Sequence, residues 1–209
     1  MNDRSPLPER IAGHQKGLLL RRWQTSDAEA LGRALAEGSE HLRPWMAWVA
    51  DEPLPLDRRR ARIEEWERDR AQGGDVLLGV FLDGQVAGGC GLHRRIAADG
   101  LEIGYWIHPG HLRRGLATRV AGLLTDAALS LPGITHVEIH HDKANRASAG
   151  VPRKLGFRWL GEAPDKPEAP ADLGIEWRWR MDRASWQGRS SADRAPGAGT
   201  AGVSLCGRP

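Results

Sequence analysis

Apolar and polar positions change their spacing several times along the chain, and these changes outline strands and helices. Residues 76–82 and 85–92 are two apolar runs separated by Asp83 and Gly84, a pair typical of a two-residue hairpin turn. In residues 101–107 apolar positions alternate with others, which predicts a further antiparallel strand. Shorter runs predict four more strands, at 18–23, 135–140, near 159–160 and at 176–181.

Four helices are predicted between these strands. Thr25, Ser26 and Asp27 offer N-caps to an Ala/Leu-rich helix, and Asp57 begins a charged helix that ends before two glycines. Apolar positions at a 3.6-residue spacing predict a third helix from 113 to 131, and a short fourth helix is predicted over 145–155. This order predicts an α+β fold, with a mixed and mostly antiparallel sheet flanked by helices.

The same patterns divide the 209 residues into one domain and two flanking segments. Residues 1–16 are polar and predict a flexible arm, and residues 17–181 have the length of a single domain. Residues 182–209 have no periodicity and few large apolar groups, which is typical of a disordered tail.

Composition narrows the class of protein. A net charge of +3 is a small excess and gives little support for a nucleic-acid partner. No apolar run is long enough to cross a membrane and no secretory signal is visible at the N-terminus, so we expect a cytoplasmic protein. Cys90 and Cys206 form neither a disulfide framework nor a metal-binding pattern, and Cys90 is interpreted as a small core residue.

The turn between strand 101–107 and the third helix is the first candidate for chemistry. Gly115 lets the backbone approach a ligand, and the free amides of the first helical turn, beside Arg113 and Arg114, suit a pyrophosphate. A tight turn with solvated arginines is the equal alternative. Neither the Walker A pattern nor GxGxxG is present, which disfavours nucleoside triphosphates and dinucleotides.

Three further motifs extend this turn into a family pattern. They are the strand Leu-Glu-Ile-Gly-Tyr-Trp-Ile at 101–107, Asn145 with Ser148, and Lys-Leu-Gly-Phe at 154–157. With the turn at 112–118, the chain resembles the GNAT superfamily of acetyl-CoA-dependent N-acetyltransferases over roughly residues 17–181. The resemblance is strongest to the branch that acetylates the N-termini of ribosomal proteins.

The resemblance implies a binding site for acetyl-CoA and no metal. The amides of 113–118 would hold the pyrophosphate, the pantetheine would pair with the strand edge, and the fourth helix would border the other wall. The implied cofactor-binding residues are Ile107, Arg113, Arg114, Gly115, Leu116, Ala117, Thr118, Asn145 and Lys154. Leu112 stands where the family has Gln or Arg, so a polar side-chain contact is lost there while main-chain donation survives.

Two residues are candidates for catalysis. Glu102 is the predicted general base, acting through a water, with a surface glutamate at the sheet edge as the alternative. Pro152 stands where many family members have a Tyr that acts as general acid, so the leaving thiolate would take its proton from Ser148, from water or unaided. Pro152 is also expected to interrupt the fourth helix and to make its last turn irregular. The histidines at 93, 136, 140 and 141 lack a zinc-site pattern and are interpreted as packing or surface residues.

The acceptor site is predicted between two loops. Trp45 and Trp48 offer an apolar or cation–π wall, and the acidic segment 162–176 would attract a cationic amine, with core packing and a solvated loop as the alternatives. The leading hypothesis is acetyl transfer from acetyl-CoA to a primary amine, with a protein or peptide N-terminus favoured. The alternatives are a small-amine (antibiotic or polyamine) acetyltransferase and a non-catalytic acyl-CoA-binding module. A homodimer is implied by the resemblance alone.

Overall fold

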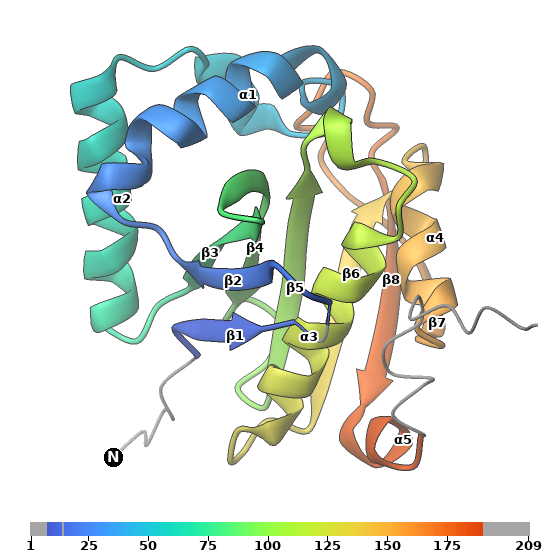
Figure 1. The fold of residues 1–209 in the computed structure, drawn as a ribbon. Coiled ribbons are helices and arrows are strands. Elements are labelled where there is room, and N and C mark those ends of the chain that lie inside the picture. The colour runs from blue at the N-terminus through green and yellow to red at the C-terminus, as the bar shows by residue number, and fades with distance from the viewer. Residues whose placement is uncertain (1–7, 14, 190–209) are drawn as a thin grey trace, which may run out of the picture.

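The computed structural model describes residues 8–13 and 15–189, which form one eight-stranded sheet with helices on both faces (Figure 1). The strand order is β1-β2-β3-β4-β5-β6-β8-β7. The strands are β1 (Arg10–Ala12), β2 (Leu18–Arg22), β3 (Val76–Leu82), β4 (Gln85–His93), β5 (Gly100–Ile107), β6 (His136–Asp142), β7 (Arg158–Pro164) and β8 (Ile175–Asp182). The helices are α1 (Ala28–Leu42), α2 (Leu56–Ala71), α3 (Leu116–Ser130), α4 (Arg146–Lys154) and α5 (Arg183–Gln187).

Every neighbouring pair of strands is antiparallel except β5 and β6. The mixed, mostly antiparallel α+β fold expected from the sequence is therefore confirmed. The hairpin between β3 and β4 turns at Asp83 (φ 50°) and Gly84 (φ 81°), and two successive positive φ angles are the geometry of a type I′ turn.

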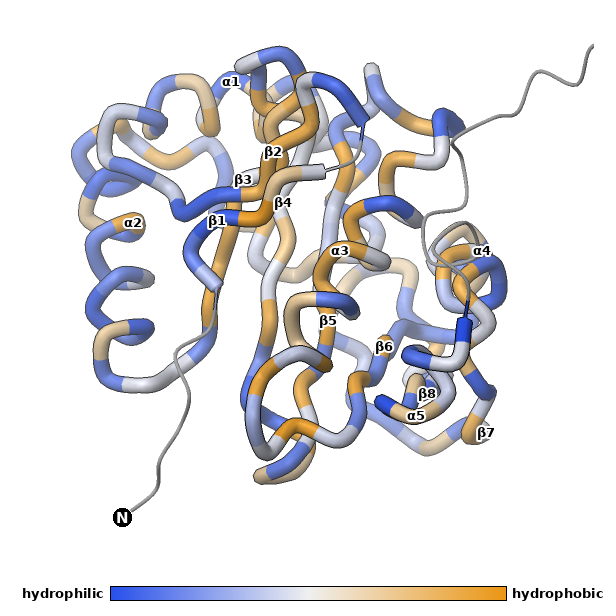
Figure 2. The backbone as a smooth tube through the Cα atoms, turned by 60° about the horizontal axis from the view of Figure 1, so that its bottom comes forward, coloured by the Kyte–Doolittle hydropathy of each residue, from blue (hydrophilic) through white to orange (hydrophobic). Residues whose placement is uncertain are grey.

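The two faces of the sheet carry separate cores. On one face α3 packs on β5, with residues such as Leu116, Val120 and Leu124 buried against Leu101 and Ile103. On the other face α1 and α2 enclose a smaller cluster that includes Leu31, Leu35 and Ile63. Figure 2 shows the same division, because the hydrophobic colour follows the strands and α3, whereas α2 is largely hydrophilic.

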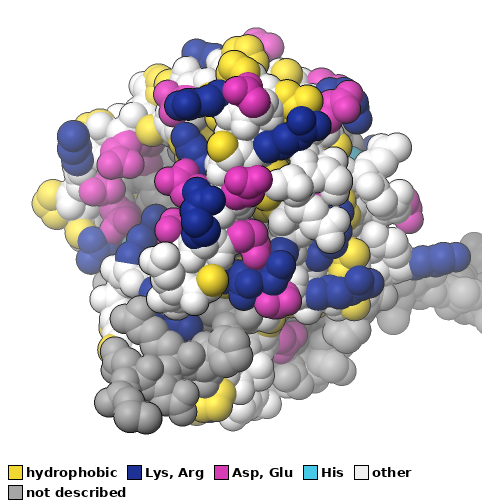
Figure 3. All heavy atoms as spheres, turned by 90° about the vertical axis from the view of Figure 1, so that its left-hand side faces the viewer, with side chains coloured by type: hydrophobic (Ala, Val, Ile, Leu, Met, Phe, Trp, Pro, Cys, Tyr) yellow, Lys and Arg dark blue, Asp and Glu magenta, His cyan; other side chains and the backbone are white. Residues whose placement is uncertain are grey.

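Charges of both signs cover the outer side of α2. Only Arg59 and Ile63 of this helix are buried, and ion pairs such as Arg62 with Glu65 (3.6 Å) lie along its surface. Figure 3 faces this side and shows Lys and Arg side chains interspersed with Asp and Glu, without a continuous basic area. Among the described residues, no helix is both long and apolar enough to cross a membrane.

The structure differs from the sequence-based expectations at both ends of the domain. Part of the predicted arm is strand β1, which pairs with β2, and part of the predicted tail is the end of β8 and helix α5. α5 packs on the domain because Trp186 is 1% exposed and its indole Nε1 donates to Asp126 Oδ1 at 2.7 Å. The remainder of the predicted tail, with Cys206, lies outside the described residues.

The parallel strands β5 and β6 pair only near their beginnings. The ladder joins Gly100 with His136 and ends where Glu102 lies opposite Glu138. Residues 103–107 of β5 and 139–142 of β6 are not hydrogen-bonded to each other. This open stretch at the centre of the sheet leaves two strand edges free, and the candidate site lies along them.

Candidate active site

A cavity of about 1030 Å³ lies between the open parts of β5 and β6 and extends to both faces of the sheet. Its wall includes the start of α3, one side of α4 and the turn that follows α1. The structure thus brings together all the site residues predicted from the sequence except Arg114. Those that line the cavity are Trp45, Trp48, Glu102, Ile107, Arg113, Gly115, Leu116, Ala117, Thr118, Asn145, Ser148 and Lys154.

The start of α3 is a set of backbone donors that faces this cavity. Arg113 (φ 59°) and Gly115 (φ 72°) both have left-handed backbone conformations, which turn the chain into the helix. The first backbone hydrogen bond of the helix runs from Arg119 N to Gly115 O at 3.1 Å. The amides of Leu116, Ala117 and Thr118 therefore have no acceptor within the helix, and their partial positive charge suits a pyrophosphate such as that of coenzyme A.

Gly115 has a backbone conformation that favours glycine. A Cβ atom built on it would meet only the side chain of Arg119 in the protein, with Nη1 at 3.3 Å, whereas the left-handed φ angle strains any residue with a side chain. That Gly115 also allows a close approach of the ligand stays a prediction. Arg114, which was expected beside the cofactor as well, does not line the cavity, and its carbonyl accepts a hydrogen bond from Arg119 Nη2 at 2.6 Å.

Leu112 combines a packing role with a place in the cavity wall. It is partly buried and packs against the larger core, and it also lines the cavity. The main-chain donors that follow it do not depend on its side chain.

The start of α4 forms the opposite wall. Asn145 caps this helix, because its Oδ1 accepts a hydrogen bond from Ser148 N at 3.1 Å. The hydroxyl of Tyr105, on β5, lies 3.0 Å from Ser148 Oγ, so the two walls are hydrogen-bonded to each other at this point. Contrary to expectation, Pro152 does not interrupt α4, which continues to Lys154.

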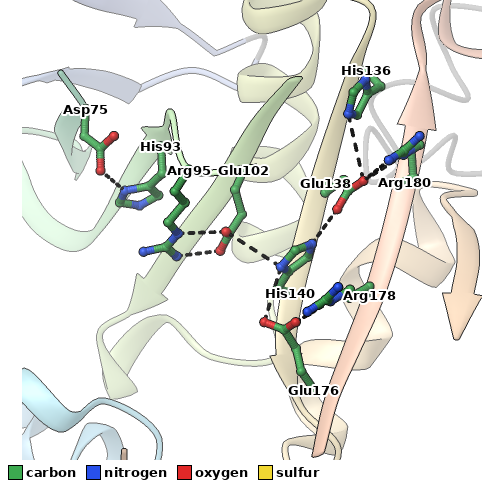
Figure 4. A network of polar contacts seen from close by, with 10 residues as sticks. All are labelled: Asp75, His93, Arg95, Glu102, His136, Glu138, His140, Glu176, Arg178 and Arg180. Carbon is green, nitrogen blue, oxygen red and sulfur yellow. Dashed lines mark hydrogen bonds and ion pairs between the residues drawn. The ribbon is translucent and has the colours of Figure 1, made fainter. Parts of the chain in front are cut away.

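Glu102 lies where the two strands separate. Its side chain is 7% exposed and receives two hydrogen bonds from Arg95, at 2.7 Å (Nε to Oε2) and 2.5 Å (Nη2 to Oε1). His140 Nδ1 is 3.7 Å from Glu102 Oε2 (Figure 4). Each carboxylate oxygen can accept more than one hydrogen bond, so the pairing with Arg95 leaves acceptor positions for a water.

His140 is the centre of an ionic cluster behind Glu102. It contacts Glu138 at 2.5 Å and Glu176 at 3.3 Å, and these carboxylates are also paired with Arg180 and Arg178 (Figure 4). Burial alone would lower the pKa of His140, but the hydrogen bonds to the two carboxylates raise it to about 9. The interpretation of His140 as a packing or surface residue is therefore incomplete, because it lines the cavity and carries a charge.

The same contacts act on the carboxylates. Burial favours the neutral form of Glu138, yet the hydrogen bonds from His140 and Arg180 lower its pKa to about 2. The hydrogen bond from His140 lowers the pKa of Glu176 to about 2 as well. His141 points to the other face, where Trp179 Nε1 donates to its Nε2 at 3.0 Å. Among the described residues, no group of three or more His, Cys, Asp or Glu could hold a metal ion.

Two loops border the cavity on the α1 and α2 face. Trp48 packs near Trp106, with ring centroids 6.5 Å apart, and Ala171 N donates to Pro44 O at 3.0 Å, which joins the β7–β8 loop to the turn after α1. In the acidic segment 162–176, some of the carboxylates are already paired with cationic side chains. Glu162 is paired with Lys143 at 2.9 Å and Glu176 belongs to the cluster of His140, whereas Glu168 and Asp172 line the cavity.

Sequence reasoning missed three residues of this site: Tyr105, Arg95 and His140. The alternation along 101–107 places Tyr105 on the face opposite Glu102, and this signal, combined with the position of the fourth helix, could have found it. Arg95 lies in a loop seven residues before Glu102, and nothing in the local pattern brings the two together. His140 required the registers of β6 and β8, which the sequence does not contain.

Comparisons with known proteins identify the class to which this fold and site belong. Residues 17–158 match the family described as acetyltransferase (GNAT) domain. The chain belongs to this family, which confirms the family and the acetyltransferase class expected from the sequence.

Relatives and solved structures agree with this assignment. The chain is 28% identical over 150 residues to the putative ribosomal N-acetyltransferase YdaF of Bacillus subtilis (strain 168), which covers 71% of this chain and 81% of that protein. The fold is similar to that of Mycobacterium smegmatis RimJ in complex with CoA-disulfide, with a TM-score of 0.78 and 19% identity. The match covers 91% of this chain and 94% of that chain. It is also similar to RimL, a ribosomal L7/L12 alpha-N-protein acetyltransferase in complex with coenzyme A, with a TM-score of 0.76 and 17% identity. This match covers 85% of this chain and 99% of that chain.

Proposed function

We propose that this protein transfers the acetyl group of acetyl-CoA to the α-amino group of a protein or peptide, in the cytoplasm. The observation that carries the proposal is one continuous cavity. It joins the backbone donors of α3 to Glu102 and to the tryptophan-lined loop through the opening between β5 and β6. Such a cavity lets a donor and an acceptor meet from opposite faces of the sheet.

The residues that bind acetyl-CoA and the predicted general base lie on different faces of the sheet. On the α3 and α4 face, the amides of Leu116, Ala117 and Thr118 hold the pyrophosphate. The free edge of β5, up to Ile107, can pair with the pantetheine. The bound acetyl-CoA supplies a thioester carbonyl. On the α1 and α2 face, Glu102 removes a proton from the incoming amine through a water. Ser148, on α4, gives a proton to the thiolate that leaves.

The acceptor side favours the end of a polypeptide chain. The hydrogen bond between Ala171 and Pro44 joins the two loops on this side of the cavity, and Glu168 and Asp172 attract a positive charge. The names of YdaF and RimL refer to ribosomal substrates, which supports a ribosomal protein as the acceptor. The homodimer implied by the family resemblance stays a prediction.

The experiment compares amines that differ only in the position of the free amino group. One peptide has a free α-amine and no lysine, its partner has a blocked N-terminus and one lysine, and a polyamine and an aminoglycoside complete the set. We expect release of free CoA, with one added acetyl group found by mass spectrometry, for the first peptide. Transfer only to a small amine would overturn the choice of acceptor, and CoA binding without any transfer would overturn catalysis.

A further inference from the structure

Tyr105 is a polar residue of the cavity wall that has no role in the proposed reaction as described above. It lies on β5, on the same face as Ile103 and Ile107, and its hydroxyl reaches across the open stretch between β5 and β6 to α4. There it lies 3.0 Å from Ser148 Oγ and 3.4 Å from Ser148 O. A single phenol therefore faces both oxygens of the residue proposed to protonate the thiolate.

The sequence explains why the carbonyl of Ser148 is available. In an α-helix this carbonyl would accept a hydrogen bond from the amide of residue 152, but Pro152 has no amide hydrogen. The helix resumes beyond it, because Leu155 N donates to Val151 O at 3.1 Å. Asn145 fixes the amide of Ser148 from the other side, at 3.1 Å. Ser148 is thus held by the N-cap of its own helix and by a side chain from β5.

We propose that Tyr105 is a positioning residue that orients the hydroxyl of Ser148 as proton donor to the leaving thiolate. The inference rests on the proposed function. When the phenol donates to Ser148 Oγ, the oxygen has an acceptor site filled, and the serine's own hydrogen is left to point into the cavity. Burial raises the pKa of Tyr105, an effect that the hydrogen bond to Ser148 only partly offsets, so the phenol stays protonated at neutral pH.

The protons of the step balance. The ammonium group first loses one proton to Glu102 through a water, which gives the neutral amine, and Glu102 passes this proton to solvent. The amine nitrogen then forms a bond to the acetyl carbon and loses its second proton to water, the carbon–sulfur bond breaks, and its electron pair remains on sulfur. Sulfur takes the hydrogen of Ser148 and water returns one to Ser148 Oγ, while Tyr105 keeps its own hydrogen. The net products are the amide, CoA and one proton in solvent, so no other reactant is needed.

The test is a double-mutant cycle with Tyr105→Phe and Ser148→Ala, which each remove one hydroxyl and keep the packing. With acetyl-CoA and an accepted peptide, we expect Tyr105→Phe to lower kcat about tenfold with little change in KM for acetyl-CoA. In the Ser148→Ala background the same change should cost less than about twofold, because the group that Tyr105 orients is gone. Additive losses in the double variant would overturn the proposal.

A second donor separates proton delivery from a structural effect. An acetyl thioester of 4-nitrothiophenol has a much better leaving group, so its departure needs little protonation. The loss of kcat/KM in Tyr105→Phe should then be smaller than with acetyl-CoA, after subtraction of the reaction without enzyme. An equal loss with both donors would show that Tyr105 acts on packing alone. If the parent enzyme is active and Tyr105→Phe matches it, this inference fails, whereas an inactive parent contradicts the proposed function itself.

Discussion

Glu102 combines two demands that usually conflict in a single carboxylate. It is buried at the point where the strands separate, and it is also paired with Arg95, whose side chain is 58% exposed. Burial of an unpaired carboxylate would be costly, and the two hydrogen bonds from Arg95 satisfy oxygens of Glu102. In the proposed reaction, an incoming ammonium group would compete with the exposed Arg95 for this carboxylate.

The first prediction concerns Glu102→Gln. General-base assistance is typically worth about 10² to 10⁴ in rate, so turnover should fall by that order while CoA binding is nearly unchanged. The loss should be partly relieved at high pH, where the amine arrives already neutral. A pH–rate series with an accepted peptide measures both effects.

Glu138→Gln is the matched control for that series. Glu138 contacts the same His140 and is as buried as Glu102, but it does not line the cavity. We expect this variant to lose stability and to keep most of the turnover. Equal losses of turnover in the two variants would assign the effect to the ionic cluster and remove Glu102 as the base.

The second prediction uses the raised pKa of His140. The group has its ordinary value of 6.5 in the unfolded chain and about 9 in the folded protein. Its ion pairs therefore stabilise the fold fully below pH 6.5, and this stabilisation is lost as the pH rises through 9. The difference in the free energy of unfolding between the parent and His140→Gln should fall by about 1 to 3 kcal/mol between pH 6 and pH 10. Denaturant titrations across this range measure it, and a constant difference would contradict the charged state of His140.

At the level of single residues, the sequence predicted which side chains line the cavity better than it predicted their contacts with one another. Glu102, expected on the strand before the glycine turn, and Ser148, implied by the family resemblance, both line the cavity, and their catalytic roles stay predictions. Arg95 and His140 were not found, because their contacts with Glu102 depend on a loop path and on strand register. Charged side chains are frequent on any surface, so their sequence positions do not reveal which of them are paired.

Among the elements, the start of α3 has the strictest conformational requirement. Arg113 and Gly115 both have positive φ angles, and together they aim the free amides of the helix at the cavity. The turn of the β3–β4 hairpin contains a second glycine with a similar angle, Gly84 (φ 81°), which does not line the cavity. A Cβ atom on Gly84 would meet nothing within 4 Å. The two glycines therefore differ in their position relative to the cavity and hardly at all in backbone strain.

The third prediction compares Gly115→Ala with Gly84→Ala. Both variants should lose about 1 kcal/mol of stability, because each places a side chain on a left-handed residue. Only Gly115→Ala should weaken CoA binding, since only there does relaxation of the backbone move the donor amides. Isothermal titration calorimetry with CoA, beside thermal unfolding, checks this. Parental CoA affinity in Gly115→Ala would mean that the pyrophosphate lies elsewhere.

Most elements followed from local patterns, and the exceptions have physical reasons. The β3–β4 hairpin and β5 were predicted because turn chemistry and alternation are local signals. β1 was missed because three residues give no period, and their pairing with β2 decides their structure. Pro152 was expected to disturb α4, but the helix loses only the hydrogen bond that the amide of residue 152 would donate. The hydroxyl of Tyr105 faces the carbonyl of Ser148, which would have accepted it.

For the whole molecule, the decisive feature is the opening between β5 and β6, which no sequence pattern predicted by itself. Both strands were predicted, but the length of their pairing depends on the packing of α3 on one face and on the antiparallel partners β4 and β8 on the other sides. The family resemblance implied the opening only through its known fold. A cavity that extends to both faces thus follows from long-range contacts rather than from any segment.

The loop between β7 and β8 links the two halves of the molecule around this cavity, and Asp142 holds it in place. Asp142 Oδ2 accepts hydrogen bonds from Leu173 N at 2.9 Å and from Gly174 N at 3.1 Å, while Oδ1 accepts from Ala144 N at 2.7 Å. Further along, Ala171 N donates to Pro44 O. One carboxylate at the end of β6 thereby holds the loop that borders the proposed acceptor side of the cavity.

The last prediction is that Asp142→Ala weakens the interaction with the peptide but not the binding of CoA. Without the carboxylate, the loop loses its charged acceptor and about 2 to 3 kcal/mol of stabilisation, so KM for the peptide should rise. CoA affinity should stay near that of the parent, because the donors of α3 lie on the other face. The control is Asp165→Ala, which removes a carboxylate from the same loop whose Oδ1 accepts a hydrogen bond from the adjacent Lys166 N, at 2.8 Å. Peptide kinetics and CoA calorimetry on both variants decide the matter. Equal weakening of peptide and CoA in Asp142→Ala would show that the loop supports the whole cavity rather than its acceptor side.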